Sequence, residues 1–446
     1  MRLFPVDLEI GDEEGFTPAK DIFKRQVFGQ GLTRLVGSVD DSLVLALDGA
    51  WGSGKTTFLR MWAGSLRQAG FPVIYYDAFQ DDHHQDAFLA LTGQIGVLAQ
   101  KSGETNQPAF DRYMRAAKKL GTSLLKRSPR VAIRVASAGL IDLADLEGVA
   151  DTAVETVRDE AEDIFSTLLD EYLKDQDTRQ QFRNCLTSLA GDLGEADAQP
   201  LIFIIDELDR CRPNFALEIL ENLKHFFSVP GIKFVLGANM AQLENSISAA
   251  YGAEIDARTY LQKFIHLRLR LPEQDFNGAS LRSSYVHYLL NAHEIDLKDD
   301  NRRYEIFEEI GRIAEAGTLS FRHIERIIAY ATLCLAFLPP RYYVDPDILA
   351  GLFTLRVLAP EKHQMALDGT LKYADVVDIL GLRASNVQDY KVEVYETIWK
   401  YFCNEELSEE KRQQMQRGLF QYSIGRESAL RVLASTISDS FLIQQP

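Results

Sequence analysis

Long apolar runs are missing from this chain of 446 residues. It contains no stretch of about 18 apolar residues, which is the length that a membrane-spanning helix needs. The first residues, MRLFPVD, also lack the apolar core of a signal peptide. Cysteine is scarce, and its spacing suits neither a metal site nor a disulfide framework. The cysteines are Cys185, Cys211, Cys334 and Cys403. We therefore expect a soluble protein of the cytoplasm with ordinary reduced thiols.

Positive charge is in deficit, because 48 Lys and Arg face 65 Asp and Glu, which gives a formal net charge of −17. Nucleic acid is therefore not indicated as a partner, although a local basic groove stays open. The hydrophobic content of 46% and the charged content of 25% are those of a globular protein. Because one core seldom exceeds about 250–300 residues, we expect two or three domains.

The most informative stretch is GAWGSGKTT at residues 49–57, which fits the phosphate-loop pattern G-x-x-x-x-G-K-[ST] at every fixed position. An apolar run precedes it and an amphipathic pattern follows it, so we expect the order strand, glycine loop, helix. The loop's N–H groups and the helix N-terminus suit phosphate. We expect Lys55 to reach the β- and γ-phosphates and Thr56 to bind Mg²⁺. The expected nucleotide-binding residues are Gly49, Trp51, Gly52, Ser53, Gly54, Lys55, Thr56 and Thr57.

A second motif, LIFIIDELDR, covers residues 201–210, where apolar residues run into two adjacent acids. A buried strand of this kind delivers Asp206 to the Mg²⁺ coordination shell. Glu207 then stands where a carboxylate can orient and deprotonate the attacking water. For Asp209 and Arg210, a local ion pair and a contact with a neighbouring subunit both stay open. Together the two motifs predict binding of a nucleoside triphosphate.

Two further polar residues are candidates for the reaction. Asn239 follows the apolar strand 233–237 and could touch the γ-phosphate or the lytic water, although it could equally cap the next helix. Arg322 and Arg326 share one face of a predicted helix, so Arg322 could reach the γ-phosphate from a helical lid. A surface salt-bridge row with Glu325 is the alternative.

The segment 107–193 has a helical pattern without a good strand. It begins basic over 112–134 and then turns acidic, so two antiparallel helices would neutralise each other. A functional alternative is that the basic helix meets lipid headgroups or nucleic acid.

These patterns predict a division of the chain into a phosphate-loop core and helical additions. In the N-terminal extension, Phe23 to Phe28 could cover the adenine or could be plain core. The expected segments are an N-terminal extension (1–36), the nucleotide-binding core (37–106 and 194–272), a helical insertion (107–193), a helical lid (273–338) and a C-terminal helical region (339–446).

Taken together, these stretches resemble the KAP family of P-loop NTPases, over about residues 16–335. The specific motifs are DGAWGSGKTTFL at 48–59 and IDELDRCRP at 205–213, supported by FVLGAN at 234–239 and YLQKF at 260–264. The resemblance implies an α/β fold with the parallel sheet of the additional-strand class, in which the Walker A and Walker B strands flank the sensor strand. It also implies ATP and Mg²⁺ as cofactors, a homo-oligomer and, for bacterial members, a frequent link to phage defence.

The chain departs from the family pattern in ways that bear on function. Many members carry transmembrane helices where this chain has 107–193, so here only a peripheral membrane contact stays open. The family often has aspartate at the positions of Glu207 and Asn239, and glutamate is the longer base usual in active ATPases. Some related ATPases need an arginine from the next subunit, for which Arg258 is the first candidate and Lys263 the second.

We therefore expect an ATPase whose nucleotide state drives conformational change or oligomer assembly. The alternative is a nucleotide-gated scaffold with little hydrolysis, which would recruit a protein partner through the insertion or the C-terminal helical region. A kinase would need an acceptor-binding lid, which the sequence does not show. No NKxD-like motif for guanine follows the sensor strand, so ATP is favoured over GTP.

Overall fold

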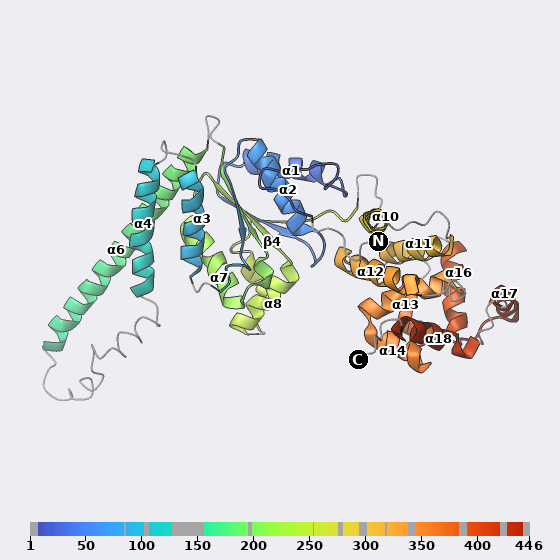
Figure 1. Cartoon of the computed structure of the whole chain (residues 1–446). Coiled ribbons are helices and arrows are strands. Elements are labelled where there is room, and N and C mark those ends of the chain that lie inside the picture. The colour runs from blue at the N-terminus through green and yellow to red at the C-terminus, as the bar shows by residue number, and fades with distance from the viewer. Residues whose placement is uncertain are drawn as a thin grey trace, which may run out of the picture.

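The computed structural model shows a parallel sheet between two layers of helices, with a long helical pair on one side and an all-helical region on the other (Figure 1). It describes residues 8–83, 86–101, 107–126, 156–194, 199–252, 254–274, 280–293, 301–316, 319–337, 345–382, 390–419 and 426–439.

The sheet has the strand order β2-β3-β4-β1-β5, and all its neighbouring pairs are parallel. Its strands are β1 (Leu43–Asp48), β2 (Val73–Asp77), β3 (Leu201–Asp206), β4 (Ile232–Ala238) and β5 (Leu267–Arg270). The sensor strand β4 therefore lies between β1 and β3, which confirms the predicted additional-strand arrangement. The register pairs Asp48 with Ala238 and Asp206 with Gly237, so the motif residues meet at one edge of the sheet.

Strand β1 shows why the sheet is buried on both faces. Its side chains alternate, so that Leu45 and Leu47 pack on one face while Val44 and Ala46 pack on the other. The first face is covered by α1 (Gln26–Ser38) and α2 (Lys55–Gln68). The second face is covered by α3 (Ala87–Lys101), α7 (Pro213–Asn222), the π-helical turn η4 (Leu223–Phe227), α8 (Met240–Tyr251) and α9 (Ala257–Leu261).

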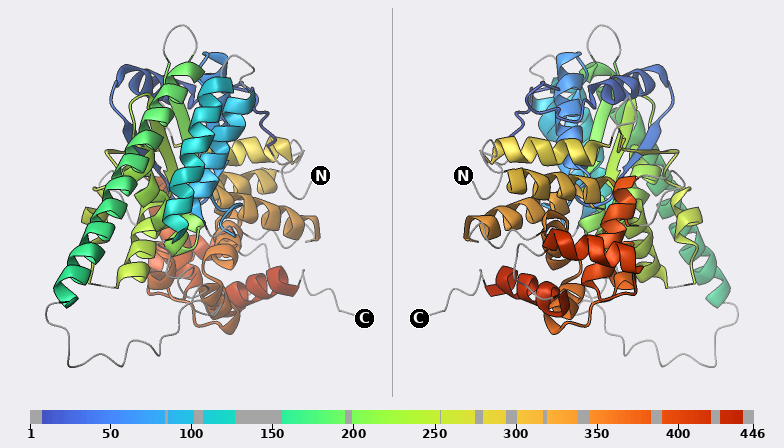
Figure 2. Two further views of the ribbon diagram at one scale, coloured as in Figure 1. Left: turned by 90° about the vertical axis from the view of Figure 1, so that its left-hand side faces the viewer. Right: turned by 90° about the vertical axis from the view of Figure 1, so that its right-hand side faces the viewer.

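The predicted helical insertion contains α4 (Gln107–Lys126) and α6 (Thr156–Leu193), which lie side by side and run in opposite directions (Figures 1 and 2). The ring of Tyr113 lies 5.7 Å from that of Phe182, which joins the pair to the core of the second face. Residues 127–155, which include part of the expected basic helix 112–134, lie outside the described residues. Among the described helices, none is long and apolar enough to cross a membrane.

The C-terminal third forms a separate helical core, here called the helical region. Its elements are α10 (Leu281–Ala292), α11 (Asn301–Ala316), α12 (Phe321–Phe337), α13 (Pro346–Leu358), α14 (Pro360–Asp368), α15 (Tyr373–Val376), α16 (Tyr390–Phe402), α17 (Glu409–Leu419) and α18 (Arg426–Asp439). Buried side chains from both sides of residue 338, among them Ile327, Phe353 and Trp399, belong to this one core. The expected lid and the rest of the C-terminal region thus pack as one body.

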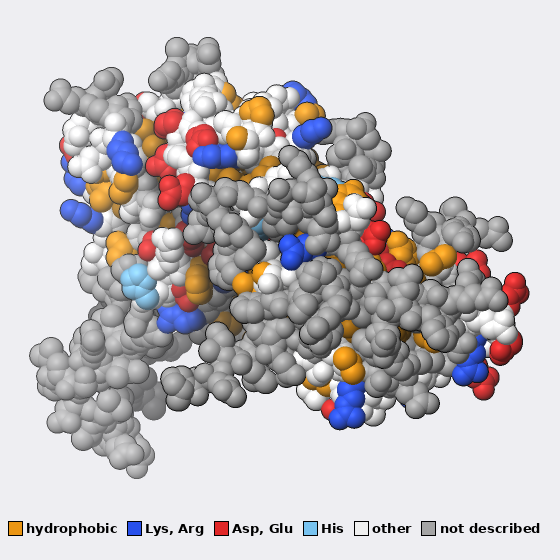
Figure 3. All heavy atoms as spheres, turned by 45° about the vertical axis from the view of Figure 1, so that its right-hand side comes forward, with side chains coloured by type: hydrophobic (Ala, Val, Ile, Leu, Met, Phe, Trp, Pro, Cys, Tyr) orange, Lys and Arg blue, Asp and Glu red, His pale blue; other side chains and the backbone are white. Residues whose placement is uncertain are grey.

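The surface in Figure 3 mixes acidic and basic side chains. Over the described part of that face, Lys and Arg are scattered among Asp and Glu and form no continuous basic patch. This distribution agrees with the acidic composition of the chain.

Candidate nucleotide-binding site

The phosphate loop joins β1 to α2 and turns through two left-handed glycines. Gly52 has φ +74° and Gly54 has φ +80°, which side-chain-bearing residues rarely adopt. Lys55 begins α2 and its side chain folds back over the loop, where Nζ donates to the carbonyls of Gly49 at 2.5 Å and Ala50 at 3.3 Å. Burial lowers the pKa of Lys55, against the attraction of nearby aspartates, chiefly Asp209. A buried ammonium held only by loop carbonyls is ready to exchange them for a phosphate.

The carboxylate at the end of β3 is buried and fully engaged. Asp206 Oδ2 accepts a hydrogen bond of 2.7 Å from the Tyr75 hydroxyl, and Oδ1 accepts one of 2.9 Å from the backbone N–H of Glu207. Burial raises the pKa of Asp206, while the hydrogen bonds from Tyr75 and from the Thr56 hydroxyl oppose that shift. Thr56 and Asp206 are thus within hydrogen-bond reach of each other. Sequence reasoning missed Tyr75, whose only signal was its place near the end of β2.

Glu207 leaves the strand with φ +59°, in the left-handed region. Its Oε1 lies 2.9 Å from Nη2 of Arg210, three residues further on. Burial raises the pKa of Glu207, and the attraction of Arg210 is the largest influence that lowers it. Asp209 in turn accepts a 2.5 Å hydrogen bond from Trp51 Nε1. Asp209 and Arg210 thus make local bonds within the chain, one to the phosphate loop and one to Glu207.

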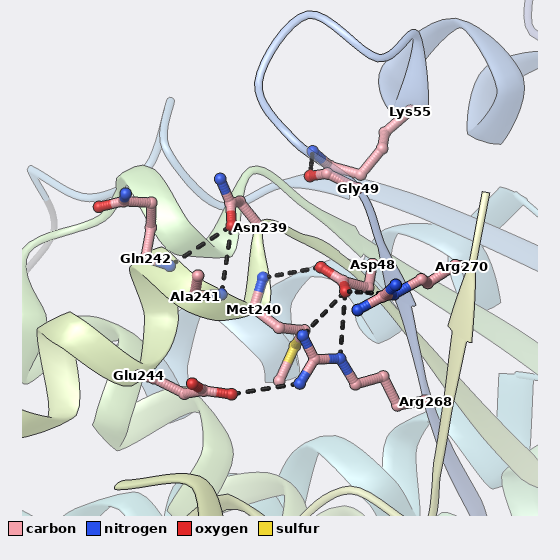
Figure 4. Close-up of polar contacts among 10 residues, drawn as sticks. All are labelled: Asp48, Gly49, Lys55, Asn239, Met240, Ala241, Gln242, Glu244, Arg268 and Arg270. Carbon is pink, nitrogen blue, oxygen red and sulfur yellow. Dashed lines mark hydrogen bonds and ion pairs between the residues drawn. The ribbon is translucent and has the colours of Figure 1, made fainter. Parts of the chain in front are cut away.

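Asn239 lies at the tip of β4 and caps α8. Its Oδ1 accepts from the backbone N–H groups of Ala241 at 3.2 Å and Gln242 at 3.4 Å. In Figure 4 the amide nitrogen of Asn239 points away from the helix that the oxygen caps. The capping role is therefore present, and it leaves the amide N–H groups available for a second contact.

Asp48, the last residue of β1, joins this strand to the start of α8 and to β5 (Figure 4). Its Oδ1 accepts from the N–H of Met240 at 3.0 Å, and its Oδ2 lies 2.8 Å from Nη2 of Arg268. Arg268 also reaches Glu244 at 3.2 Å, and Arg270 lies 3.8 Å from Asp48. These contacts fix the start of the phosphate loop relative to β4 and β5. Sequence reasoning gave Asp48 no such role.

A cavity of about 460 Å³ lies between the phosphate loop, the end of β3, the N-terminal segment and the helical region. Of the expected site residues, those that line it are Trp51, Gly52, Gly54, Lys55, Thr56, Thr57, Asp206, Glu207 and Arg322. Gly49, Ser53 and Asn239 lie beside it without lining it. Arg258 is exposed on α9, and the exposed Lys263 lies 4.8 Å from the ring of Tyr260.

The helical region reaches the cavity through the start of α12. The N–H of Phe321 donates to the carbonyl of Gly52 at 3.1 Å, and Arg322 packs against the same glycine. Phe321 stacks on Phe23 with ring centroids 4.4 Å apart, and Tyr285 completes the cluster at 5.0 Å from Phe321. Phe23 thus lines the cavity, whereas Phe28 packs in the core against Phe58, with ring centroids 5.5 Å apart.

The residues present fit a nucleotide with Mg²⁺. The buried Oγ of Ser53 has no hydrogen-bond partner in the described structure, beside a loop whose left-handed glycines leave room for phosphate. Thr56 and Asp206 offer the oxygen ligands that Mg²⁺ prefers. No group of three or more His, Cys, Asp or Glu among the described residues could hold a metal alone.

Known proteins that match part of this chain include the following two. The phage T7 exclusion protein of Escherichia coli K12 is 25% identical over 248 residues, which are 53% of this chain and 31% of that protein. The hemin import ATP-binding protein HrtA of Staphylococcus aureus MRSA252 is 32% identical over 127 residues, 23% of this chain and 57% of HrtA. The match thus spans about half of HrtA and less than a third of the exclusion protein.

Solved structures that this chain matches weakly include an ORC2 protein and a DnaA protein. The ORC2 protein of Aeropyrum pernix, in ADPNP–ADP complexes, is 12% identical and covers 97% of each chain with a TM-score of 0.35. The replication initiator DnaA bound to AMPPCP and single-stranded DNA is 12% identical, covers 95% of this chain and 92% of its own, and has a TM-score of 0.30.

The family assignment rests on a longer match. The family model described as the KAP family P-loop domain matches residues 28–330, which is well over half of the chain. This range contains the phosphate loop, the carboxylates at the end of β3 and all the strands of the sheet. The chain therefore belongs to the KAP family of P-loop NTPases.

Proposed function

We propose that this protein binds ATP with Mg²⁺ and hydrolyses it, and that its nucleotide state changes the position of the helical region or drives oligomer assembly. The observation that carries the proposal is the set of residues that line one cavity. Lys55, Thr56, Asp206, Glu207 and Arg322 line it together, although they come from the phosphate loop, β3 and α12.

In this proposal each residue acts on a different part of the triphosphate. Lys55 and the loop N–H groups bind the β- and γ-phosphates, and Thr56 and Asp206 hold Mg²⁺. Mg²⁺ held there would supply positive charge against the phosphate oxygens. Glu207 takes the proton of the attacking water while the bond between the γ-phosphorus and the bridging oxygen breaks, which releases ADP and phosphate. Arg322 stabilises charge on the γ-phosphoryl group.

The remaining contacts complete the substrate pocket. Phe23, Tyr285 and Phe321 offer ring faces on which an adenine can stack. Asn239, through its amide nitrogen, is proposed to orient the water or the γ-phosphate. In this proposal the core at 37–106 and 194–272 acts on the helical region through the expected lid at 273–338, which shares a core with the rest of that region.

A second candidate is a nucleotide-gated scaffold with slow turnover, and the pairing of Glu207 with Arg210 favours it. In the described structure Oε1 of the proposed base lies 2.9 Å from Nη2 of Arg210, and the attraction of Arg210 lowers the pKa of Glu207, which makes it a weaker base. The likeness to the phage T7 exclusion protein supports a role in phage defence. A protein partner would then bind the insertion or the C-terminal helices.

The test is phosphate release from ATP by purified wild type, Glu207→Gln and Lys55→Ala. We expect turnover to fall at least 100-fold in both variants, with ATP binding retained only in Glu207→Gln. Glu410→Gln, on the exposed start of α17, is the matched control and should keep wild-type turnover. Turnover that survives Glu207→Gln would contradict the assignment of the base. Binding without turnover in the wild type would favour the scaffold.

The same assay tests an arginine supplied by a neighbouring subunit. If Arg258 acts in trans, specific activity should rise with protein concentration and Arg258→Ala should abolish that rise. Turnover strictly proportional to concentration across the assembly range, measured alongside light scattering, would exclude the role.

A further inference from the structure

Arg25 is a buried arginine that no sequence motif singled out. The carboxylate of Asp21 accepts the backbone N–H groups of Arg25 at 2.8 Å and of Gln26 at 2.9 Å. These bonds hold the turn that leads into α1, which begins at Gln26. As a result Arg25 is directed inward and is only 4% exposed.

The guanidinium joins two parts of the chain that are far apart in sequence. Nη1 donates to the carbonyl of Ser53 in the phosphate loop at 3.0 Å. Nη2 donates to the carbonyl of Pro272 at 2.9 Å, just where the chain leaves β5 for the helical region. Arg25 therefore links the loop that would hold phosphate to the exit of the nucleotide-binding core.

A third contact reaches the helical region itself. The guanidinium carbon lies 4.8 Å from the ring centre of Phe23 and 5.8 Å from that of Phe321, at the start of α12. Phe321 also donates its N–H to Gly52 of the phosphate loop. One side chain thus touches the loop, the exit and the first turn of the helix that carries Arg322.

The electrostatics show that this arrangement is costly. Burial lowers the pKa of Arg25 to about 10, although Asp21 and Glu273 act in the opposite direction. The buried Nε has no hydrogen-bond partner in the described structure. A cation buried against two carbonyls is expensive relative to an apolar side chain of the same size. Packing between Phe23 and Phe321 alone would not require a charged side chain, so the charge is explained by the two carbonyls that Arg25 joins.

We propose that Arg25 is a positioning residue through which occupancy of the phosphate loop sets the position of the helical region. Phosphate in the loop must draw Lys55 away from the carbonyls of Gly49 and Ala50, and the backbone of the loop shifts with it. Because the Ser53 carbonyl is bonded to Arg25, that shift moves the guanidinium against Pro272 and Phe321. The inference rests on the proposed ATP binding and names the residue that transmits it.

Two independent readouts separate binding from transmission. Trp62 and Trp399 are fully buried, whereas Trp51 is 47% exposed and lines the cavity, so tryptophan fluorescence reports on the loop. Amide hydrogen exchange of residues 321–337 reports on α12. In the wild type we expect ATP to change both signals.

The variants are Arg25→Met and Arg25→Lys, with Arg34→Met on the exposed face of α1 as the control. In Arg25→Met the Trp51 response should persist, with the Kd for ATP raised no more than about 10-fold, while the change in α12 exchange shrinks at least fivefold. In Arg25→Lys the charge remains but the planar fork that joins the carbonyls of Ser53 and Pro272 is lost, so the change should shrink at least threefold. Arg34→Met should match the wild type.

The outcomes decide between the two proposals. An α12 response of wild-type size in either Arg25 variant would overturn the role of Arg25. Absence of any Trp51 and α12 response to ATP in the wild type would instead overturn the proposed nucleotide binding. If circular dichroism shows that Arg25→Met fails to fold, the milder Arg25→Lys decides.

Discussion

Two buried lysines lie at opposite ends of the same sheet. Lys55, at the carboxyl end, is 8% exposed and donates to the carbonyls of Gly49 and Ala50. Lys233, at the amino end of β4, is 1% exposed and donates to the carbonyls of Val39 and Asp41. Burial lowers the pKa of both. The two lysines thus resemble each other in their burial, in the carbonyls to which they donate and in the direction of their pKa shifts.

The surroundings separate them. Lys55 lines a cavity beside Asp206 and Asp209, and its partner carbonyls belong to a loop built around glycine. Lys233 holds the segment that leads into β1 and does not line that cavity. A buried lysine with a lowered pKa is therefore not evidence of a site by itself. What distinguishes a binding lysine is that its partners can be exchanged for a ligand.

The sharpest test of this comparison is Lys55→Met. We expect ATP affinity to fall at least 100-fold, because the phosphate loses its ammonium ligand. The free energy of unfolding should change by less than about 1 kcal/mol, since Lys55 lines the cavity and water can replace its ammonium at the two loop carbonyls. Calorimetric titration with ATP and urea unfolding measure the two quantities. A large loss of stability would make Lys55 a structural residue like Lys233.

Lys233→Met should give the reverse pattern. Two carbonyls lose their donor, so the free energy of unfolding should fall by about 2 kcal/mol. ATP affinity should stay within twofold of the wild type, because Lys233 lies at the other end of the sheet. Urea unfolding and the same titration report both values. A selective loss of ATP binding would break the comparison between the two ends.

Tyr75→Phe is a smaller change at the carboxyl end of the sheet, because it removes only one hydroxyl group. The hydroxyl donates to Asp206, so its loss should weaken the apparent affinity for Mg²⁺ about three- to tenfold in the ATPase assay. Tyr76→Phe, on the next residue of the strand, is the matched control. Equal effects of the two changes would mean that the hydroxyl of Tyr75 plays no special part.

The smallest expected effect concerns pH. Glu207 can accept a proton only when it is ionised, so turnover should fall as the pH drops through its raised pKa. Removal of Arg210 removes the attraction that lowers this pKa. In Arg210→Met the acid limb of the pH–rate profile should therefore move to higher pH. Arg212→Met, which breaks a pair with Asp82 instead, should leave the limb in place. A shift to lower pH would contradict the pairing.

Sequence reasoning reached the fold and the motif residues because both depend on local pattern. The phosphate loop, the acids after β3 and the strand order follow from short stretches and their resemblance to a family. The sequence did not predict the roles of Arg25, Tyr75 and Asp48, because these roles depend on contacts between residues that are far apart in the chain. The bond from Arg25 to Pro272 spans 247 residues, and no periodicity encodes it. The shared core on both sides of residue 338 was likewise invisible, since amphipathic helices do not reveal which partners they choose.

Gly237 lies opposite Asp206 in the register of the sheet, outside both motifs. A Cβ atom there would sit 2.5 Å from Asp206 Oδ1 and 2.5 Å from Leu59 Cδ1, closer than atoms can approach. A single methyl group on the neighbouring strand would therefore displace the carboxylate proposed to hold Mg²⁺. Random mutagenesis that selects for loss of function should recover substitutions at this glycine, and a reading based on motifs alone would score them as harmless.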